Sequence, residues 1–160
     1  MTKINWPKLF GSLVLTYSAS WLGSYFTRPQ IATWYSGLKK TAITPPSWVF
    51  APVWTILFLM MALAFYLIWN EDNKRGSRKK ARLIFYIQLA FNILWTLVFF
   101  NLHRVGLAII CIVILIVAII YCLTNFYKLN KTAGWLILPY LIWTCYAALV
   151  NISIFFANLK

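Results

Sequence analysis

Residues 105–127 read VGLAIICIVILIVAIIYCLTNFY, a stretch without a single charged side chain. A helix needs about 20 predominantly apolar residues to cross a hydrocarbon core roughly 30 Å thick. Within such a helix every backbone amide and carbonyl can pair inside the segment, as the water-free bilayer core requires. This stretch therefore predicts a membrane-spanning helix and sets the fold class.

The composition of the whole chain agrees with this prediction. Hydrophobic residues make up 62% of the 160 residues, charged residues only 11%, and the mean hydropathy is +0.76. Soluble domains contain about 25% charged residues, so a water-soluble globular domain is excluded. We expect one all-α integral membrane domain over residues 1–160, built as a bundle of five transmembrane helices. The predicted crossings cover residues 6–26, 45–69, 81–101, 105–127 and 133–156.

Prolines set the predicted boundaries of the first two helices. Arg28-Pro29 is expected to end the first crossing, because proline cannot continue a helix. The outward loop that follows, residues 28–44, mixes aromatic and cationic residues that suit the membrane surface. Thr44 is the expected N-cap of the second helix, because Pro45 fits the first helical position.

The charge of the chain is strongly unbalanced. Fifteen Lys and Arg residues oppose two acidic residues, which gives a formal charge of +13. The basic residues lie mostly between the apolar runs, where they orient helices and meet anionic lipids, so nucleic acid is not an expected partner. Most of them lie on the side of the N-terminus and of residues 74–82. This bias predicts a cytoplasmic membrane, with the N-terminus inside and the C-terminus outside.

Three of the predicted helices each carry aromatic and amide side chains along one face. These faces consist of Phe50, Trp54 and Phe58, of Gln88, Asn92 and Trp95, and of Tyr140, Trp143, Ala147 and Asn151. Polar groups inside a membrane span are costly and mark function by default. Turned inward, the three faces would build an uncharged aromatic cavity for a large, flat, apolar ligand. A second interpretation stays open, in which the amides join helices and the aromatic residues anchor the membrane interface.

Signatures of enzyme chemistry are missing from the sequence. Both acidic residues, Glu71 and Asp72, lie in one predicted loop, which argues against active ion transport. The only histidine, His103, lies in a predicted turn, and the three cysteines lack metal-ligand spacing. We therefore expect no metal site and no required cofactor.

Three motifs carry a family resemblance. Residues 44–55 read TPPSWVFAPVWT, residues 88–95 read QLAFNILW, and residues 139–143 read PYLIW. With Trp34-Tyr35 and Leu38-Lys39 ahead of them, they resemble the bacterial-type translocator proteins, also called tryptophan-rich sensory proteins or TspO/MBR. The resemblance implies a five-helix bundle, commonly a homodimer, that binds protoporphyrin IX, haem, and isoquinoline or benzodiazepine drugs. The cholesterol segment of animal members is not evident, so sterol transport is not expected.

The resemblance also implies which residues bind the ligand. Tyr140 joins this set from the inward face described above. The expected ligand-binding residues are Phe50, Ala51, Trp54, Asn92, Trp95, Tyr140, Trp143 and Ala147. The expected lid over the pocket consists of Trp34, Tyr35, Leu38 and Lys39.

The expected function is a membrane receptor or sensor for tetrapyrroles. The ligand ring would stack on Trp54 and Trp143, while Lys39, Lys40 or Arg28 would attract its propionates at the outer mouth. Two alternatives stay open: a transporter of tetrapyrroles or lipids, and an enzyme that degrades porphyrin with light and oxygen. The resemblance implies Trp54 and Trp143 as the catalytic residues of that enzyme.

Overall fold

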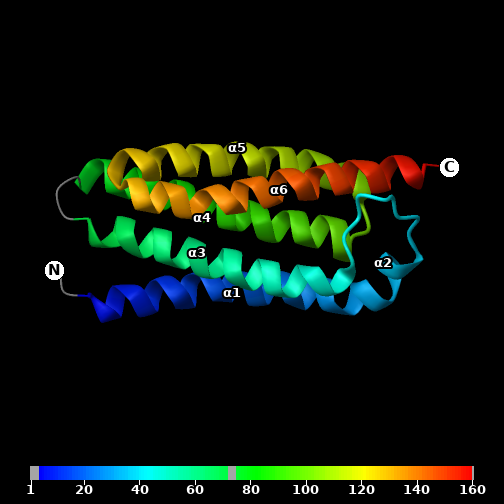
Figure 1. The fold of residues 1–160 in the computed structure, drawn as a ribbon, viewed down its shortest axis with the longest axis horizontal. Helices are drawn as coiled ribbons and strands as arrows, with labels where there is room; N and C mark the ends of the chain where they lie inside the picture. The colour runs from blue at the N-terminus through cyan, green and yellow to red at the C-terminus, as the bar shows by residue number, and fades with distance from the viewer. Residues whose placement is uncertain (1–3, 72–74, 160) are drawn as a thin grey trace.

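The computed structural model describes residues 4–71 and 75–159, and every regular element in that part of the chain is helical (Figure 1). Five long helices are accompanied by three short ones. In chain order they are α1 Trp6–Ala32, α2 Trp34–Gly37, the 3₁₀ turn η1 Ser47–Val49, α3 Phe50–Asn70, α4 Arg75–Thr96, the π-helix η2 Leu97–Asn101, α5 Val105–Leu129 and α6 Lys131–Ala157.

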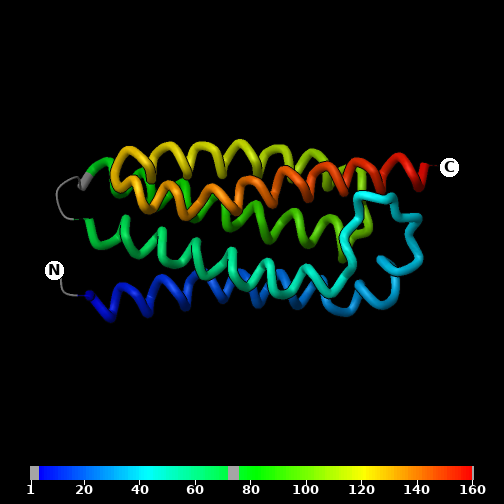
Figure 2. The backbone as a smooth tube through the Cα atoms, in the orientation of Figure 1, coloured from blue at the N-terminus to red at the C-terminus, as the bar shows by residue number. Residues whose placement is uncertain are grey.

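The long helices run lengthwise beside one another as an elongated bundle, with the chain ends at opposite ends of it (Figure 1). Helix α6 packs against α5 and α3, and α1 packs against α3 and α4. The connection between α1 and α3, residues 33–46, crosses one end of the bundle and comes close to the last turns of α6 (Figure 2).

Four of the described helices are long and apolar enough to span a membrane, namely α4 to α6 and α3 with its preceding turn. The protein is therefore a multi-pass integral membrane protein with a helical bundle. Helix α1 has 27 residues but does not reach this apolarity. Its sequence is rich in Ser, Thr and Gly, and Ser12 and Thr16 are fully buried in the bundle. Four of the five predicted crossings therefore correspond to helices that are long and apolar enough to span a membrane. The crossing by α1 stays a prediction.

The predicted end of the first helix at Arg28-Pro29 is wrong. Helix α1 contains Pro29 and continues to Ala32, although proline leaves the carbonyl of Tyr25 without its usual donor. The last turns of α1 pack against η2, and Ile31 lies half-buried against the hydrophobic core. Tertiary packing therefore maintains the helix beyond the proline.

The predicted start of the second helix at Thr44 is also wrong. The Thr44 hydroxyl accepts a hydrogen bond from the Thr41 amide at 3.3 Å, and the Thr44 amide donates to the Thr41 carbonyl at 2.9 Å. Thr44 thus closes a turn. A residue that precedes proline avoids the helical region, so the Pro45-Pro46 pair delays the helix until η1 begins at Ser47.

Two predicted loops are shorter in the structure. Helix α4 begins at Arg75 instead of residue 81, because the basic residues there are good helix formers and can extend beyond the apolar span. Only Asn130 separates α5 from α6, where a loop over residues 128–131 was expected. The Asn130 side chain accepts a hydrogen bond from the Ala133 amide at 3.1 Å and so caps α6 immediately.

A stack of phenylalanines fills the half of the bundle away from the connection 33–46. The rings of Phe65 and Phe85 stack at 4.6 Å between centroids, and Phe85 stacks on Phe126 at 5.7 Å. All three side chains are fully buried and join α3, α4 and α5. The two cavities of the candidate site lie in the other half of the bundle.

Candidate ligand-binding cavity

The main cavity has a volume of about 180 Å³ and lies between α1, α3, α4 and α6. Of the residues predicted to bind the ligand, all except Tyr140 line it. They are Phe50 and Ala51 at the start of α3, Trp54 one turn further, Asn92 and Trp95 on α4, and Trp143 and Ala147 on α6. Four segments far apart in sequence therefore meet at one space.

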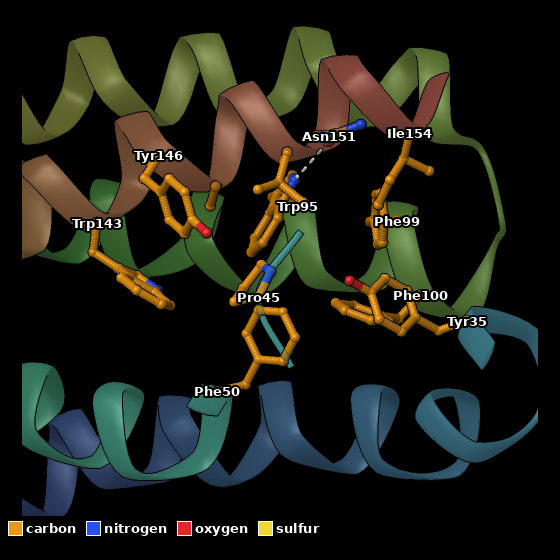
Figure 3. A pocket seen from close by; sticks show the side chains of 12 residues that line it. Tyr35, Pro45, Phe50, Trp95, Phe99, Phe100, Trp143, Tyr146, Asn151 and Ile154 are labelled. Atoms are coloured by element: carbon orange, nitrogen blue, oxygen red, sulfur yellow. Dashed lines mark hydrogen bonds between the residues drawn. The ribbon is translucent and has the colours of Figure 1, made fainter. Parts of the chain in front are cut away.

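A small cavity of about 30 Å³ adjoins the main one beneath the connection 33–46. Figure 3 shows aromatic side chains from the connection, α3, α4, η2 and α6 around this space. Both cavities share the side chains of Phe50, Trp95, Phe100, Trp143 and Ala147. Rearrangement of these side chains would merge the two spaces.

Trp54 lies at the centre of an aromatic cluster. Its ring centroid lies 5.7 Å from that of Phe58, 6.5 Å from that of Trp95 and 6.1 Å from that of Tyr140. Tyr140 is fully buried and lines neither of the two cavities. Its ring makes an edge contact with the Trp54 indole.

The buried amides form hydrogen bonds between helices. Asn92 donates to the Tyr140 hydroxyl at 2.9 Å, which joins α4 to α6. Asn151 accepts from the Trp95 indole at 3.2 Å and donates to the Val105 carbonyl at 3.1 Å, so it joins α6 to α4 and α5. These bonds fix the orientation of Trp95 in the cavity wall (Figure 3).

Two buried donors that line the small cavity lack a hydrogen-bond partner among the described residues. They are the indole nitrogen of Trp143 and the hydroxyl of Tyr35. An unsatisfied buried donor costs about 1–3 kcal/mol. A ligand with acceptor atoms would remove this cost. Gln88 is also buried with neither amide atom paired, but it lines neither cavity.

Helix α2 places two of the predicted lid residues over the cavities. Tyr35 is 2% exposed, and its ring packs on those of Phe50, Phe99 and Phe100. Burial, with a smaller contribution from Tyr146, raises the pKa of Tyr35 to about 12. Trp34 stacks on the imidazole of His103 with 4.3 Å between ring centroids and lies outside both cavity linings.

The remainder of the connection 33–46 is fastened to α6. The Asn158 side chain bonds both the amide and the carbonyl of Lys39, each at 3.0 Å. The Tyr146 hydroxyl donates to the Ile43 carbonyl at 2.7 Å. The predicted lid residues Leu38 and Lys39 line neither cavity, since Leu38 packs on the core and Lys39 is exposed.

Two walls of the site contain residues beyond the predicted set. Ser20, Ser24 and Thr27 join Arg28, which the sequence places at the outer mouth, in a polar wall from α1, and η2 contributes Phe100 to both cavities. The spacing of the α1 residues, close to i, i+4, i+7 and i+8, was readable from the sequence as one helical face. The π-helix has no comparable sequence signal, although π-helical turns are frequent at functional sites.

Similarity to known proteins extends over nearly the whole chain. The model of the TspO/MBR family matches residues 12–157. Among similar proteins, the tryptophan-rich protein TspO of Archaeoglobus fulgidus is 35% identical over 97% of this chain and 99% of its own length. The tryptophan-rich sensory protein of Cereibacter sphaeroides is 36% identical over 74% of this chain and 72% of its own. The human translocator protein is 29% identical over 96% of this chain and 91% of its own length. The chain therefore belongs to the TspO/MBR family.

Proposed function

We propose that this protein is a membrane receptor or sensor that binds tetrapyrroles such as protoporphyrin IX and haem in the main cavity. Isoquinoline and benzodiazepine compounds are the drug-like ligands of the same site. One observation carries the proposal: the indoles of Trp54, Trp95 and Trp143 line one cavity, and the Trp143 N–H has no partner there among the described residues.

The chemistry of the walls suits such a ligand. Offset or edge contacts between aromatic rings contribute about 0.5–1.5 kcal/mol each beyond the burial of apolar area. A porphyrin edge also offers acceptor atoms to the N–H of Trp143 and the hydroxyl of Tyr35. Relatives of this chain are named translocator protein and tryptophan-rich sensory protein, and these names support a transport or sensory role.

The volume of the cavity sets a condition on binding. Pockets for drug-sized ligands usually have about 300–1,000 Å³, and the main cavity has about 180 Å³. A tetrapyrrole therefore needs a wider space. The connection 33–46 is the wall most easily displaced, because it is held by a few hydrogen bonds at its edge and covers the small cavity.

The test is a titration of the purified protein with protoporphyrin IX in the dark, monitored by its tryptophan fluorescence. We expect saturable quenching, with Kd raised about three- to tenfold by Trp143→Phe, which loses the unpartnered donor, and by Trp54→Phe. Trp135→Phe is the matched control, because this exposed indole contacts Tyr127 and lines neither cavity. Unsaturable quenching of the wild type would reject the proposal.

Light distinguishes the enzymatic alternative, in which the indoles next to the ligand take part in porphyrin oxidation by oxygen. If absorbance of the bound porphyrin disappears faster than in protein-free micelles, and Trp54→Phe or Trp143→Phe abolishes the difference, the protein is a photo-oxidative enzyme. A stable spectrum supports a receptor. Porphyrin flux into sealed vesicles distinguishes the transporter.

The proposal includes the arrangement in the membrane. Helix α1 would be the fifth crossing, since its 27 residues extend about 40 Å and it lies alongside α3. The end of the bundle with Lys79, Lys80 and Lys128 would face the cytoplasm. A homodimer in a cytoplasmic membrane completes the proposal, and cross-linking in native membranes tests the dimer.

A further inference from the structure

The wall that α1 contributes to the main cavity differs in chemistry from the other walls. Ser20, Ser24, Thr27 and Arg28 lie along one face of α1 and line the cavity. All aromatic side chains of the lining come from α3, α4, η2 and α6. A ligand in this space therefore meets π-faces on one side and hydroxyl groups with a guanidinium group on the other.

Arg28 has no acidic partner in the described part of the chain. The only acidic residue there is Glu71, which directly follows α3. The C-terminal end of α3 lies beside the start of α1, as the bond from Lys8 to Asn70 shows, and thus at the end of the bundle opposite to Arg28 (Figure 1). The described residues therefore leave the charge of Arg28 without a counterion, so that a bound anion can supply one.

The other basic residues near the site are placed differently. The Lys40 ammonium lies 4.9 Å from the centroid of the Tyr35 ring and donates to the Ser36 carbonyl. Lys39 is exposed, and its backbone is held by Asn158. Among the described residues, Arg28 is the only cation that lines either cavity.

Arg28 also faces the outside of the bundle. Together with Ser24, Gln30 and Asn101 it lines a hollow on the surface next to the main cavity. Its side chain is exposed and therefore accessible to water and lipid head groups. A ligand can place its charged group at this border while its rings stay inside.

We propose that Arg28, with the hydroxyl of Ser24, forms a carboxylate-binding subsite of the main cavity. The planar guanidinium donates two parallel hydrogen bonds to a carboxylate, which a lysine ammonium cannot match. The cavity then selects flat aromatic molecules that carry an acidic group on one edge. This inference rests on the proposed function, because it names the ligand class of the same site.

The experiment compares protoporphyrin IX with its dimethyl ester, which has the same ring but no carboxylate. Each porphyrin is titrated in the dark against the wild type, Arg28→Gln, Arg28→Lys and the control Lys128→Gln, whose exposed side chain lines neither cavity. For each porphyrin only the ratio of Kd between variant and wild type is used, so unequal partition into detergent cancels. We expect Arg28→Gln to weaken binding of the acid about tenfold and of the ester less than twofold, with Arg28→Lys in between.

Each outcome has a distinct meaning. No change of Kd for Lys128→Gln together with the selective loss for Arg28→Gln supports the subsite. Equal weakening of acid and ester by Arg28→Gln, or no weakening of either, overturns the subsite while the proposed function stands. Absence of saturable binding of both porphyrins to the wild type overturns the proposed function and the subsite together.

Discussion

The polar side chains around the cavities fall into two groups, distinguished by whether the protein itself provides a partner. Asn92 and Asn151 bond across helices, as the second interpretation of the sequence has it. Trp143 and Tyr35 carry buried donors without partners among the described residues. Sequence spacing places all four side chains on inward faces or in the lid, but only the structure separates those that hold helices from those available to a ligand.

Tyr35 should titrate at unusually high pH. Burial raises the pKa of its hydroxyl from 10.0 to about 12, so the folded protein holds this proton more tightly than the unfolded chain. The stability that this provides is complete below pH 10 and is lost as the pH rises towards 12. The difference between tyrosinate absorbance titrations of wild type and Tyr35→Phe should have its midpoint near pH 12. A midpoint near pH 10 would contradict the buried position.

Replacement of Asn151 by leucine should destabilise the bundle. The substitution leaves the buried Trp95 indole without its acceptor, at a cost of about 1–3 kcal/mol, and also removes the bond to the part-buried Val105 carbonyl. Asn125→Leu is the control, because Asn125 bonds only the carbonyl of Tyr121 in its own helix. Thermal unfolding in detergent should show a lower Tm for Asn151→Leu alone. Equal Tm values would show that the two bonds contribute nothing net.

At the scale of elements, the sequence predicted the long helices well and their ends poorly. The apolar runs that become α5 and α6 need only length and hydropathy to be found. The course of α1 through Pro29 depends on packing against η2, and the late start of α3 depends on the turn that Thr44 closes. Both are tertiary or local backbone effects that a single-residue rule about proline or capping does not contain.

Helices α5 and α6 approach so closely at Gly134 that a larger side chain does not fit there without movement of the backbone. A Cβ atom at this position would lie 2.7 Å from the Cα atom of Tyr127, so backbone must move. We expect Gly134→Ala to lower the stability by about 1–3 kcal/mol, as overpacked positions do. Gly76→Ala is the control, since a Cβ there meets nothing within 4 Å. A Tm of Gly134→Ala equal to that of this control would contradict the packing of α5 on α6.

The two hydrogen bonds between the Asn158 side chain and the Lys39 backbone should control the rate of ligand exchange. Asn158→Ala removes both hydrogen bonds that hold the backbone of Lys39 to the end of α6. We expect protoporphyrin IX to dissociate several-fold faster in stopped-flow chase experiments, because the connection 33–46 opens more readily. Thr33→Ala, which loses only a local bond to the Pro29 carbonyl, should leave the rate unchanged. Similar dissociation rates for both variants would show that these two hydrogen bonds do not limit the dissociation of the ligand.

At the scale of the whole molecule, the aromatic cavity follows from the sequence, but the placement of the polar α1 face against it does not. The stripes with Trp54, Trp95 and Trp143 are visible because tryptophan at helical spacing is rare and large. The hydroxyls of α1 and Arg28 resemble ordinary residues of a helix and its end. Only the antiparallel packing of α1 against α3 turns them toward the same space.

The orientation of the bundle can be measured with a cysteine reagent that does not cross membranes. Ser36→Cys, exposed in α2, should react in intact cells, and Ser77→Cys, exposed at the start of α4, only after permeabilisation. The unchanged protein is the control, because its cysteines lie in α5 and α6. The reverse pattern would show that the basic end faces outward.

The weak apolarity of α1 also has a consequence for biosynthesis. A segment enters the bilayer during translation according to its own transfer free energy, and hydroxyl residues make that of α1 poor. The side chains of Ser12 and Thr16 are buried away from lipid only once α3 and α4 are present. We therefore expect α1 to complete its insertion after the helices that follow it. The wall that α1 contributes to the ligand cavity would then be the last to form.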